Sequence, residues 1–169
     1  MKKIIALFSV TLVLMGSSIP IPPNHETALA QTADELLCEV ARREPHFGGM
    51  FVGPDRVLRI YLSEESPDIV ASVKKAIAIV YGDRLALNRI QVLKGEYGFL
   101  QLKAWYESLS AGVLGIPGVV FTDLEETKNR LRVGVEKPEI KDLVKDRLVQ
   151  LGIPLEAVII EETKPIQLE

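Results

Sequence analysis

The sequence is poor in the two side chains on which many catalytic and metal sites depend. It contains one cysteine, Cys38, and two histidines, His25 and His46. A single cysteine cannot form an internal disulfide, so the folded chain must be held together by packing. Structural zinc sites draw all their ligands from such side chains, and this sequence supplies too few of them. We therefore expect no metal site and no cofactor.

The chain also lacks an excess of positive charge. It has 20 Lys and Arg residues against 23 Asp and Glu residues, which gives a net charge of −3, and the two signs are interspersed. Binding to nucleic acid requires a basic face, so we expect no nucleic-acid partner. The length of 169 residues suits one domain with its own hydrophobic core.

The N-terminal apolar run, Ile4–Met15, is too short to cross a membrane. It is broken by Ser9 and Thr11, and a membrane-spanning helix takes about 20 residues. A pair of lysines precedes it, and the small-x-small pattern Ala28-Leu29-Ala30 follows. This arrangement is typical of a secretory signal peptide over residues 1–30, and it predicts a secreted, periplasmic or cell-envelope protein. The alternative is a retained N-terminal anchor, which is the only membrane association that we expect.

After residue 30 the chain alternates between helix-like and strand-like segments. Residues 31–46 are interpreted as an N-terminal helix and a linker, and residues 164–169 as a polar tail. No duplicated sequence is apparent, although βα units recur. Alternating and β-branched residues predict strands over 56–63, 88–95, 118–123, 129–135 and 157–163. Apolar residues at helical spacing predict helices over 67–81, over 99–109 and from Pro138 to Leu151.

The order of these segments from residue 57 is β-α-β-α-β-β-α-β. The last six have the β-α-β-β-α-β order of ferredoxin-like folds, preceded by an extra β-α unit. We therefore predict an α+β fold, with a single domain over residues 47–163 built as a two-layer sandwich. Each helix has one apolar stripe, so the helices should cover one side of an open, antiparallel-rich sheet and leave the other side polar.

His46 and Cys38 are the first side chains to consider for catalysis. His46 stands beside Gly48 and Gly49, and a histidine near neutral pH is a common general base. No Gly-x-Ser-x-Gly motif lies nearby, so we interpret His46 as a surface histidine in a loop. Cys38 is interpreted as a buried, inert thiol. The alternative, a reactive Cys38 paired with His46, lacks surroundings that would activate the thiol.

Carboxylates gather in two loops, which hold Glu64, Glu65 and Asp68 before a helix and Asp123, Glu125 and Glu126 in a hairpin. Their spacing fits no known calcium loop, so we interpret them as solvated. A carboxylate-dependent hydrolase around Asp123 and Glu126 stays open as an alternative. Gly95 and Gly98 precede a helix, but the lysine of a phosphate-binding loop is absent.

The polar side of the predicted sheet is the main candidate for a binding surface. Over residues 129–135, every second side chain is apolar, and Arg130 and Arg132 point the other way. These two arginines could meet an acidic or polar partner, and an open sheet edge could pair with an extended peptide. The alternative is an edge blunted by charge that has no partner. This pattern favours a binding protein and not an enzyme.

Three segments carry a resemblance to a known family: FGGMFVGPDRVLRIYLSE, GVVFTDLEETKNRLRVGV and LGIPLEAVIIEET. They resemble units in the pro-regions of secreted bacterial serine proteases of the alpha-lytic protease and streptogrisin type. The second segment is similar to a strand–loop–strand hairpin with fixed Asp and Asn positions, here Asp123 and Asn129. Uncharacterised exported bacterial proteins with this hairpin are an equally good comparison.

Pro-regions of that type are not enzymes. They bind their protease through a sheet surface and a C-terminal segment, assist its folding and then inhibit it. The present chain carries no protease domain. The resemblance therefore implies an exported, non-catalytic protein-binding domain that acts as a stand-alone inhibitor or folding assistant of an extracellular protease. A cell-envelope interaction module with no protease partner is the alternative.

Overall fold

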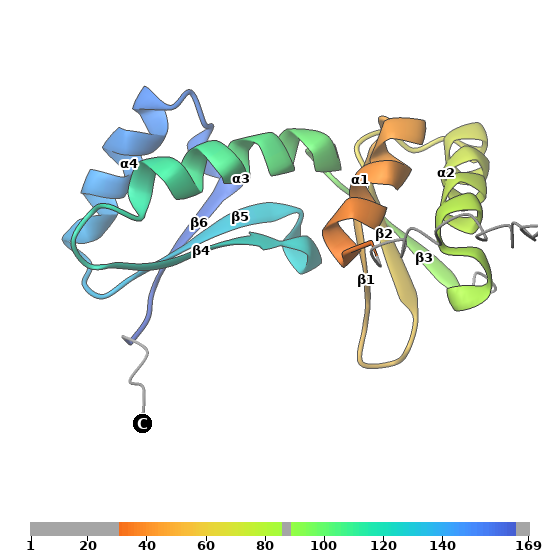
Figure 1. Cartoon of the computed structure of the whole chain (residues 1–169), viewed down its shortest axis with the longest axis horizontal. Coiled ribbons are helices and arrows are strands. Elements are labelled where there is room, and N and C mark those ends of the chain that lie inside the picture. The colour runs from red at the N-terminus through yellow and green to blue at the C-terminus, as the bar shows by residue number, and fades with distance from the viewer. Residues whose placement is uncertain (1–30, 86–88, 165–169) are drawn as a thin grey trace, which may run out of the picture. The chain divides into compact units, whose positions relative to one another are not determined.

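The structure is a computed structural model that describes residues 31–85 and 89–164. The predicted signal peptide and residues 165–169 of the predicted tail lie outside these residues. The described part has an α+β fold, as predicted, with four α-helices and two three-stranded sheets (Figure 1). The elements are α1 (Ala33–Arg43), β1 (Phe47–Val52), β2 (Leu58–Leu62), α2 (Pro67–Tyr81), η1 (Gly82–Arg84), β3 (Ile90–Lys94), α3 (Phe99–Val113), β4 (Val119–Glu125), η2 (Glu126–Lys128), β5 (Arg130–Val135), α4 (Ile140–Gln150), η3 (Leu155–Ala157) and β6 (Val158–Glu162).

The helix boundaries follow from local signals in the sequence. Ser66 caps α2 by accepting a hydrogen bond from the Ile69 amide at 3.2 Å, and Pro67 occupies the first turn. Gly82 ends this helix with a φ of 56°, a conformation that glycine adopts without strain. At α1, the side chains of Thr32 and Glu35 form a reciprocal capping box.

The strands pair into two separate sheets and not into one. We call the sheet of β1, β2 and β3 sheet A, and the sheet of β4, β5 and β6 sheet B. The element order β-α-β-β-α-β from β3 onward is present as predicted, but β3 pairs with β2 and so belongs to sheet A. Strand β1 includes Gly48 and Gly49, which the sequence analysis placed in a loop.

Each sheet has its own core on one face. In sheet A, Leu58, Ile60 and Leu62 of β2 are buried among residues of α1 and α2. In sheet B, the buried residues of β5 are Leu131, Val133 and Val135, as their alternation predicted, and they pack among residues of α3 and α4. Figure 1 shows each pair of α-helices on the same side of its sheet, which leaves the opposite side of each sheet without an α-helix.

The two halves are built by the same succession of elements: helix, strand, strand, helix, strand. Residues 33–94 (α1 to β3) form the unit that we call the first repeat, and residues 99–162 (α3 to β6) form the second repeat. In both, the first two strands are antiparallel and the last two are parallel. The structure thus contains a duplication that the sequence analysis did not detect.

The strand registers match between the repeats as closely as the element order does. The dipeptide Leu58-Arg59 of β2 corresponds to Leu131-Arg132 of β5, since each leucine pairs with the first residue of the third strand. Each hairpin also contains one non-glycine residue with positive φ two positions before this dipeptide. These residues are Arg56, with a φ of 58°, and Asn129, with a φ of 52°.

Asn129 joins the two repeats. Its side chain is almost fully buried, with 1% of its surface exposed. The amide nitrogen Nδ2 donates to the carbonyls of Gly48 and Tyr97, both at 2.8 Å, and Oδ1 accepts from the amides of Glu96 and Tyr97 at 2.8 and 3.0 Å. One residue of the β4–β5 hairpin therefore holds both strand β1 and the segment between the repeats, and its polar atoms are satisfied by these bonds.

A second contact between the repeats comes from Tyr61, on the face of sheet A that carries no α-helix. Its hydroxyl donates to the carbonyl of Thr127, in the β4–β5 hairpin, at 2.8 Å. Gly48 and Gly95 lie on either side of this tyrosine, and a Cβ at either position would approach the Tyr61 Cβ to within 3.2 Å. A Cβ at Gly48 would also come within 2.9 Å of Nδ2 of Asn129. The hairpin thus docks on sheet A where glycines leave room for it.

Candidate functional site

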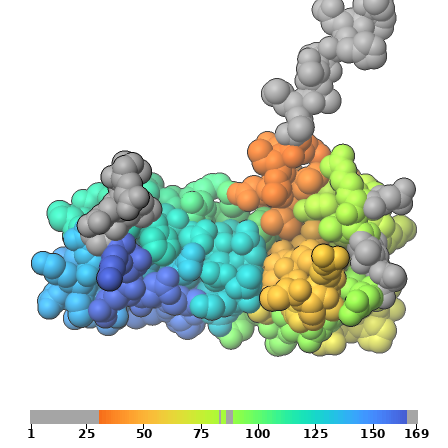
Figure 2. All heavy atoms as spheres, turned by 90° about the horizontal axis from the view of Figure 1, so that it is seen from below, coloured from red at the N-terminus to blue at the C-terminus, as the bar shows by residue number. Residues whose placement is uncertain are grey.

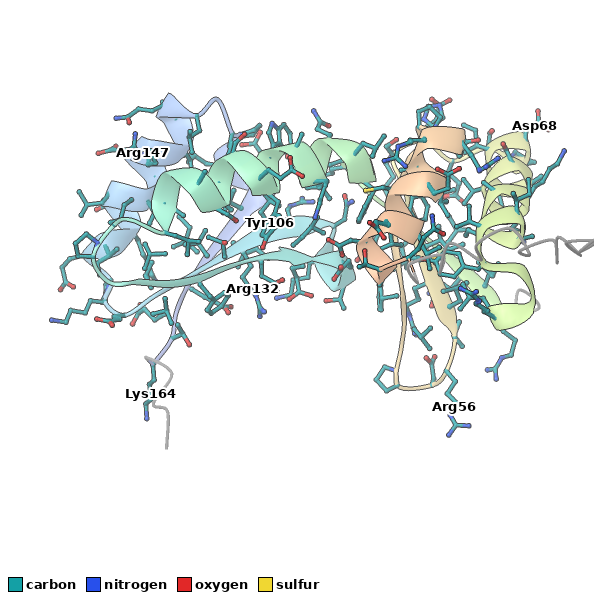
Figure 3. The ribbon with its side chains drawn as sticks, in the orientation of Figure 1. Arg56, Asp68, Tyr106, Arg132, Arg147 and Lys164 are labelled. Atoms are coloured by element: carbon teal, nitrogen blue, oxygen red, sulfur yellow. The ribbon has the colours of Figure 1, made fainter. Side chains whose placement is uncertain are left out.

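Each sheet has one face that carries no α-helix, and on sheet A the β4–β5 hairpin lies against this face. On sheet B this face carries Phe121, Asp123 and Glu125 of β4, Arg132 of β5, and Ile159 and Glu161 of β6, all of them half-buried. We call this set the open face of sheet B. Figure 3 shows Arg132 on the side of the sheet away from α3, whereas Tyr106 of α3 lies between the helix and the sheet. In Figure 2, residues of β4, β5 and β6 (cyan to blue) form part of the molecular surface.

Arg132, one of the two predicted binding residues, lies at the centre of this face and is surrounded by carboxylates. Its guanidinium is 2.8 Å from Asp123, 3.5 Å from Glu125 and 3.4 Å from Glu161. Desolvation alone would lower its pKa, but the hydrogen bond to Asp123 and the three negative charges raise the pKa of Arg132 above its ordinary value. One positive charge thus faces three negative ones, and the face is acidic.

An aromatic ring completes the arrangement around Arg132. The guanidinium carbon lies 5.0 Å from the centre of the Phe121 ring, within the range of a cation–π contact. The ring itself lies over Gly134 of β5, because a Cβ at Gly134 would come 2.3 Å from Cε1 of Phe121. The open face of sheet B is therefore a platform of one half-exposed ring and one arginine, bordered by carboxylates.

Arg130, the other predicted binding residue, is engaged at the junction between the repeats. Its guanidinium forms an ion pair with Glu96 at 2.7 Å and donates to the Asn129 carbonyl at 2.9 Å. It also lies 5.1 Å from the centre of the Tyr97 ring. The structure does not bring Arg130 and Arg132 together as a free basic pair, and each already has carboxylate partners.

The acidic hairpin between β4 and β5 contains two glutamates with opposite pKa shifts. A hydrogen bond from the side chain of Thr127 lowers the pKa of Glu125, and the nearby charge of Arg132 acts in the same direction. Burial raises the pKa of Glu126, and the negative charges of Asp123, Asp34 and Glu125 raise it further. A carboxyl with a raised pKa is the feature that the hydrolase alternative requires, and Glu126 has it.

His46 precedes β1 and contacts the segment after β2. Its Nδ1 atom is 3.5 Å from the Ser63 hydroxyl and 3.8 Å from Oε2 of Glu64. In a serine hydrolase the hydroxyl and the carboxylate approach opposite nitrogens of the imidazole, whereas here both approach the same nitrogen. The geometry therefore does not favour a serine–histidine–glutamate triad at this loop.

Cys38 lies in α1 and is half-buried, with its side chain packed against the first core. The sequence analysis interpreted it as a buried thiol, whereas the structure leaves it partly exposed. Lys103 of α3 forms an ion pair with Asp34, the second residue of α1. Lys103 donates a hydrogen bond of 2.6 Å to the carboxylate of Asp34, and this bond raises the pKa of Lys103. This ion pair links α1 to α3 and provides another contact between the repeats.

The segment with Gly95 and Gly98 is not free to hold a phosphate as a nest of amides. The amides of Glu96 and Tyr97 both donate to Oδ1 of Asn129. An open depression does lie beside this segment, and Ala41, Arg42, Pro45, Ser63, Glu96, Gly98, Leu100 and Gln101 line it. Its charged side chains of both signs give it no preference for an anion.

Two further structural findings concern residues 31–85 and 89–164. Within these ranges no helix combines the length and the apolar character needed to span a membrane. Nor do three or more His, Cys, Asp or Glu side chains in this part of the chain come together in an arrangement that could hold a metal ion.

Sequence reasoning missed the roles of Phe121, Gly134 and the glutamate at 161. The alternation around Arg132 predicted which face it occupies, but its partners depend on the pairing of β5 with β4 and β6. Asn129 was noted only as a fixed position of the pro-region hairpin, and its buried contacts explain why an asparagine fits there. A comparison with protein-family models and with curated proteins finds no match for this chain, so its resemblance to protease pro-regions stays a prediction.

Proposed function

We propose that this protein is an exported, non-catalytic domain that binds another protein through an uncovered sheet face or sheet edge. The observation that carries the proposal is the architecture of the repeats. Each has two helices on one side of a three-stranded sheet, and the other side of sheet B is occupied by no other described element. A sheet face with a half-exposed ring and charges at its border is suited to protein contact.

The first partner class to test is a secreted serine protease. The resemblance of three segments to protease pro-regions supports this choice, and the hairpin that carries the Asp123 and Asn129 positions forms the framework of sheet B. The protein would then act on a separate protease as an inhibitor or folding assistant. A cell-envelope partner unrelated to proteases is the alternative within the same proposal.

The experiment is a capture from the compartment to which the protein is exported. The full chain, with its own N-terminal segment and an affinity tag, is produced in cells that secrete it, and bound proteins are recovered from medium and envelope. The proposal predicts one exported partner in stoichiometric amount that binds again when both proteins are purified. Inhibition or faster refolding of a secreted serine protease by the purified chain would identify the predicted class. Recovery of no stoichiometric partner, together with no effect on any secreted protease, would contradict the proposal.

The carboxylate-dependent hydrolase is retained as a second candidate because the pKa of Glu126 is raised. The purified protein is assayed on peptide, ester and glycoside substrates beside a Glu126→Gln variant. The binding proposal predicts equal background rates for the two. A measurable turnover that the substitution abolishes would support the hydrolase instead.

A further inference from the structure

Both sheets have a bulge between their first two strands, and the two repeats differ in what covers this bulge. In the first repeat, the bulge is the place where Gly48 and Gly49 of β1 oppose Tyr61 of β2. The hairpin of the second repeat lies on it, with Asn129 bound to Gly48 and Thr127 bound to Tyr61. In the first repeat, therefore, this place is an interface.

In the second repeat the corresponding bulge has Val120 and Phe121 of β4 opposite Gly134 of β5. There, no other described element covers the place, and the half-exposed ring of Phe121 lies over the glycine. The residue after the third strand forms the same hydrogen bond in both repeats. The Gly95 amide donates to the Leu62 carbonyl in the first repeat, and the Thr163 amide donates to the Val135 carbonyl in the second, both at 2.8 Å. The second repeat thus retains the bulge and the strand pairing of the first, but the Phe121 ring takes the space over its glycine and no described element docks there.

The charges around the bulge of sheet B indicate which kind of partner would fit there. In the first repeat, Arg59 is balanced by one carboxylate, because Asp55 holds it with bonds of 2.8 and 2.9 Å. The corresponding Arg132 faces Asp123, Glu125 and Glu161. Like charges held this close repel one another, so the open face of sheet B gains stability if an additional positive charge approaches it.

A second copy of this chain is a poor occupant on the same grounds. The element that docks on sheet A is the β4–β5 hairpin, and it carries Glu125 and Glu126 against one lysine, Lys128. The same hairpin from another copy would bring two more carboxylates to a face that already has an excess of them. Charge complementarity therefore favours a different, basic protein.

We propose that the open face of sheet B binds a positively charged loop or strand of the partner protein, centred on Phe121 and bordered by Asp123, Glu125 and Glu161. The proposal rests on the proposed binding function and specifies its site and the chemistry of its partner. The partner's arginine or lysine side chains would contact the carboxylates, and their apolar stems would cover the Phe121 ring and Ile159. The Nε atom of Arg132, buried and without a hydrogen-bond partner among the described residues, lies beneath this contact. This reverses the charge that the sequence analysis expected of the partner.

The test uses a defined probe, a nine-residue peptide of alternating arginine and valine with blocked ends, and the full chain with isotope-labelled amides. We expect chemical-shift changes concentrated in β4, β5 and β6, and an affinity that falls as salt is raised from low to physiological concentration. The double variant Asp123→Asn with Glu161→Gln should weaken binding by about tenfold, because it removes two exposed charge contacts. It leaves Arg132 with polar neighbours, so folding is preserved and is checked by thermal unfolding.

A matched control removes the same charge from the helical side: Glu139→Gln with Asp142→Asn, at the start of α4. This variant should bind the peptide within twofold of the unaltered chain. Absence of peptide binding, equal weakening by both variants, or shifts confined to the helices would each overturn the proposal. If the captured natural partner binds equally well to the Asp123/Glu161 variant, the inference fails while the binding function stands.

Discussion

The two repeats place an aromatic side chain and glycine on opposite strands. In sheet A the ring belongs to β2, at Tyr61, and the glycines to β1, at Gly48 and Gly49. In sheet B the ring belongs to β4, at Phe121, and the glycine to β5, at Gly134. Tyr61 reaches out to bind the hairpin of the other repeat, whereas Phe121 lies back over its own sheet. One arrangement makes an internal interface, and the other leaves a surface that a separate protein can cover.

This comparison indicates how one duplicated unit can serve two purposes. The first repeat supplies a docking place and balances Arg59 with a single carboxylate. The second supplies the hairpin that docks, and it keeps an acidic face of its own. Substitutions can break the interface between the repeats, exchange the aromatic ring and the glycine of a bulge, or remove charges from either repeat.

The largest effect is expected for Asn129→Ala, which removes the side chain that joins the repeats. It leaves the Gly48 and Tyr97 carbonyls and two amides without their partner, and it places alanine at a positive φ. Each buried group left unsatisfied costs about 1–3 kcal/mol, so we expect the free energy of unfolding to fall by roughly 3 kcal/mol or more. Denaturant unfolding measures it.

Arg56→Ala is the matched control, because Arg56 has a similar positive φ in the other hairpin but is exposed. Its loss of stability should be no more than about 1 kcal/mol. Similar losses for the two variants would show that Asn129 acts through its backbone angle and not through the contacts between repeats.

The next largest effect is expected for variants that exchange the positions of the aromatic ring and the glycine in sheet B. A Cβ at Gly134 would collide with Phe121, so Gly134→Tyr alone should destabilise the fold by about 1–3 kcal/mol. Adding Phe121→Gly gives sheet B the arrangement of sheet A and should restore most of that loss, which a double-mutant cycle measures. Additive losses from the two substitutions would contradict the proposed equivalence of the bulges.

A smaller and pH-dependent effect is expected for Glu126→Gln. Because burial raises the pKa of Glu126 in the folded state, the protonated form favours folding, and this contribution is lost as the pH rises through the folded pKa. The variant should therefore unfold at a higher temperature than the unaltered chain at neutral pH, and the difference should vanish below about pH 4, where both states are protonated. A stabilisation that persists at low pH would contradict this assignment.

The smallest effect is expected for Asp55→Asn. The hydrogen bonds from Arg59 lower the pKa of Asp55 to about 2, but the pair is at the surface. Stability linked to this group is present above its unfolded pKa and is lost as the pH falls through about 2. Because the pair is at the surface, we expect only a slightly lower melting temperature for the variant at neutral pH. In the unaltered chain, a carbon-detected NMR titration of Asp55 should have its midpoint near the stated pKa. A midpoint at the ordinary aspartate value would show that the ion pair does not form.

Local signals predicted the parts of this fold that depend on neighbouring residues. Ser66, Pro67 and Gly82 gave both ends of α2, and strict alternation gave the buried face of β5. Strand β1 was missed because Gly48 and Gly49 are typical of a loop. They belong to a strand because its bulge needs a positive φ of 115° at Gly49, and because Asn129 leaves no space for a Cβ at Gly48.

The candidate site was predicted less completely than the fold. The sequence placed Arg132 on the polar face of its sheet, but its three carboxylates come from β4, β5's antiparallel partner, and from β6, its parallel partner. The docking of the second repeat on the first depends on contacts of Asn129 with residues far away in the chain. The segments LRIYLSEESPDI and LRVGVEKPEI share a pattern of apolar and charged residues, and the strand registers relate them residue by residue.

The most direct test of the central claim compares Phe51 with Phe121 in the complex of the full chain with its captured partner. Both rings are half-exposed, and each lies beside the arginine that the repeats have in common. Hydroxyl-radical footprinting measures how readily each ring is oxidised. If the open face of sheet B is the binding surface, the oxidation of Phe121 falls sharply on complex formation and that of Phe51 stays the same. Protection of Phe51 with Phe121 unchanged would contradict the account.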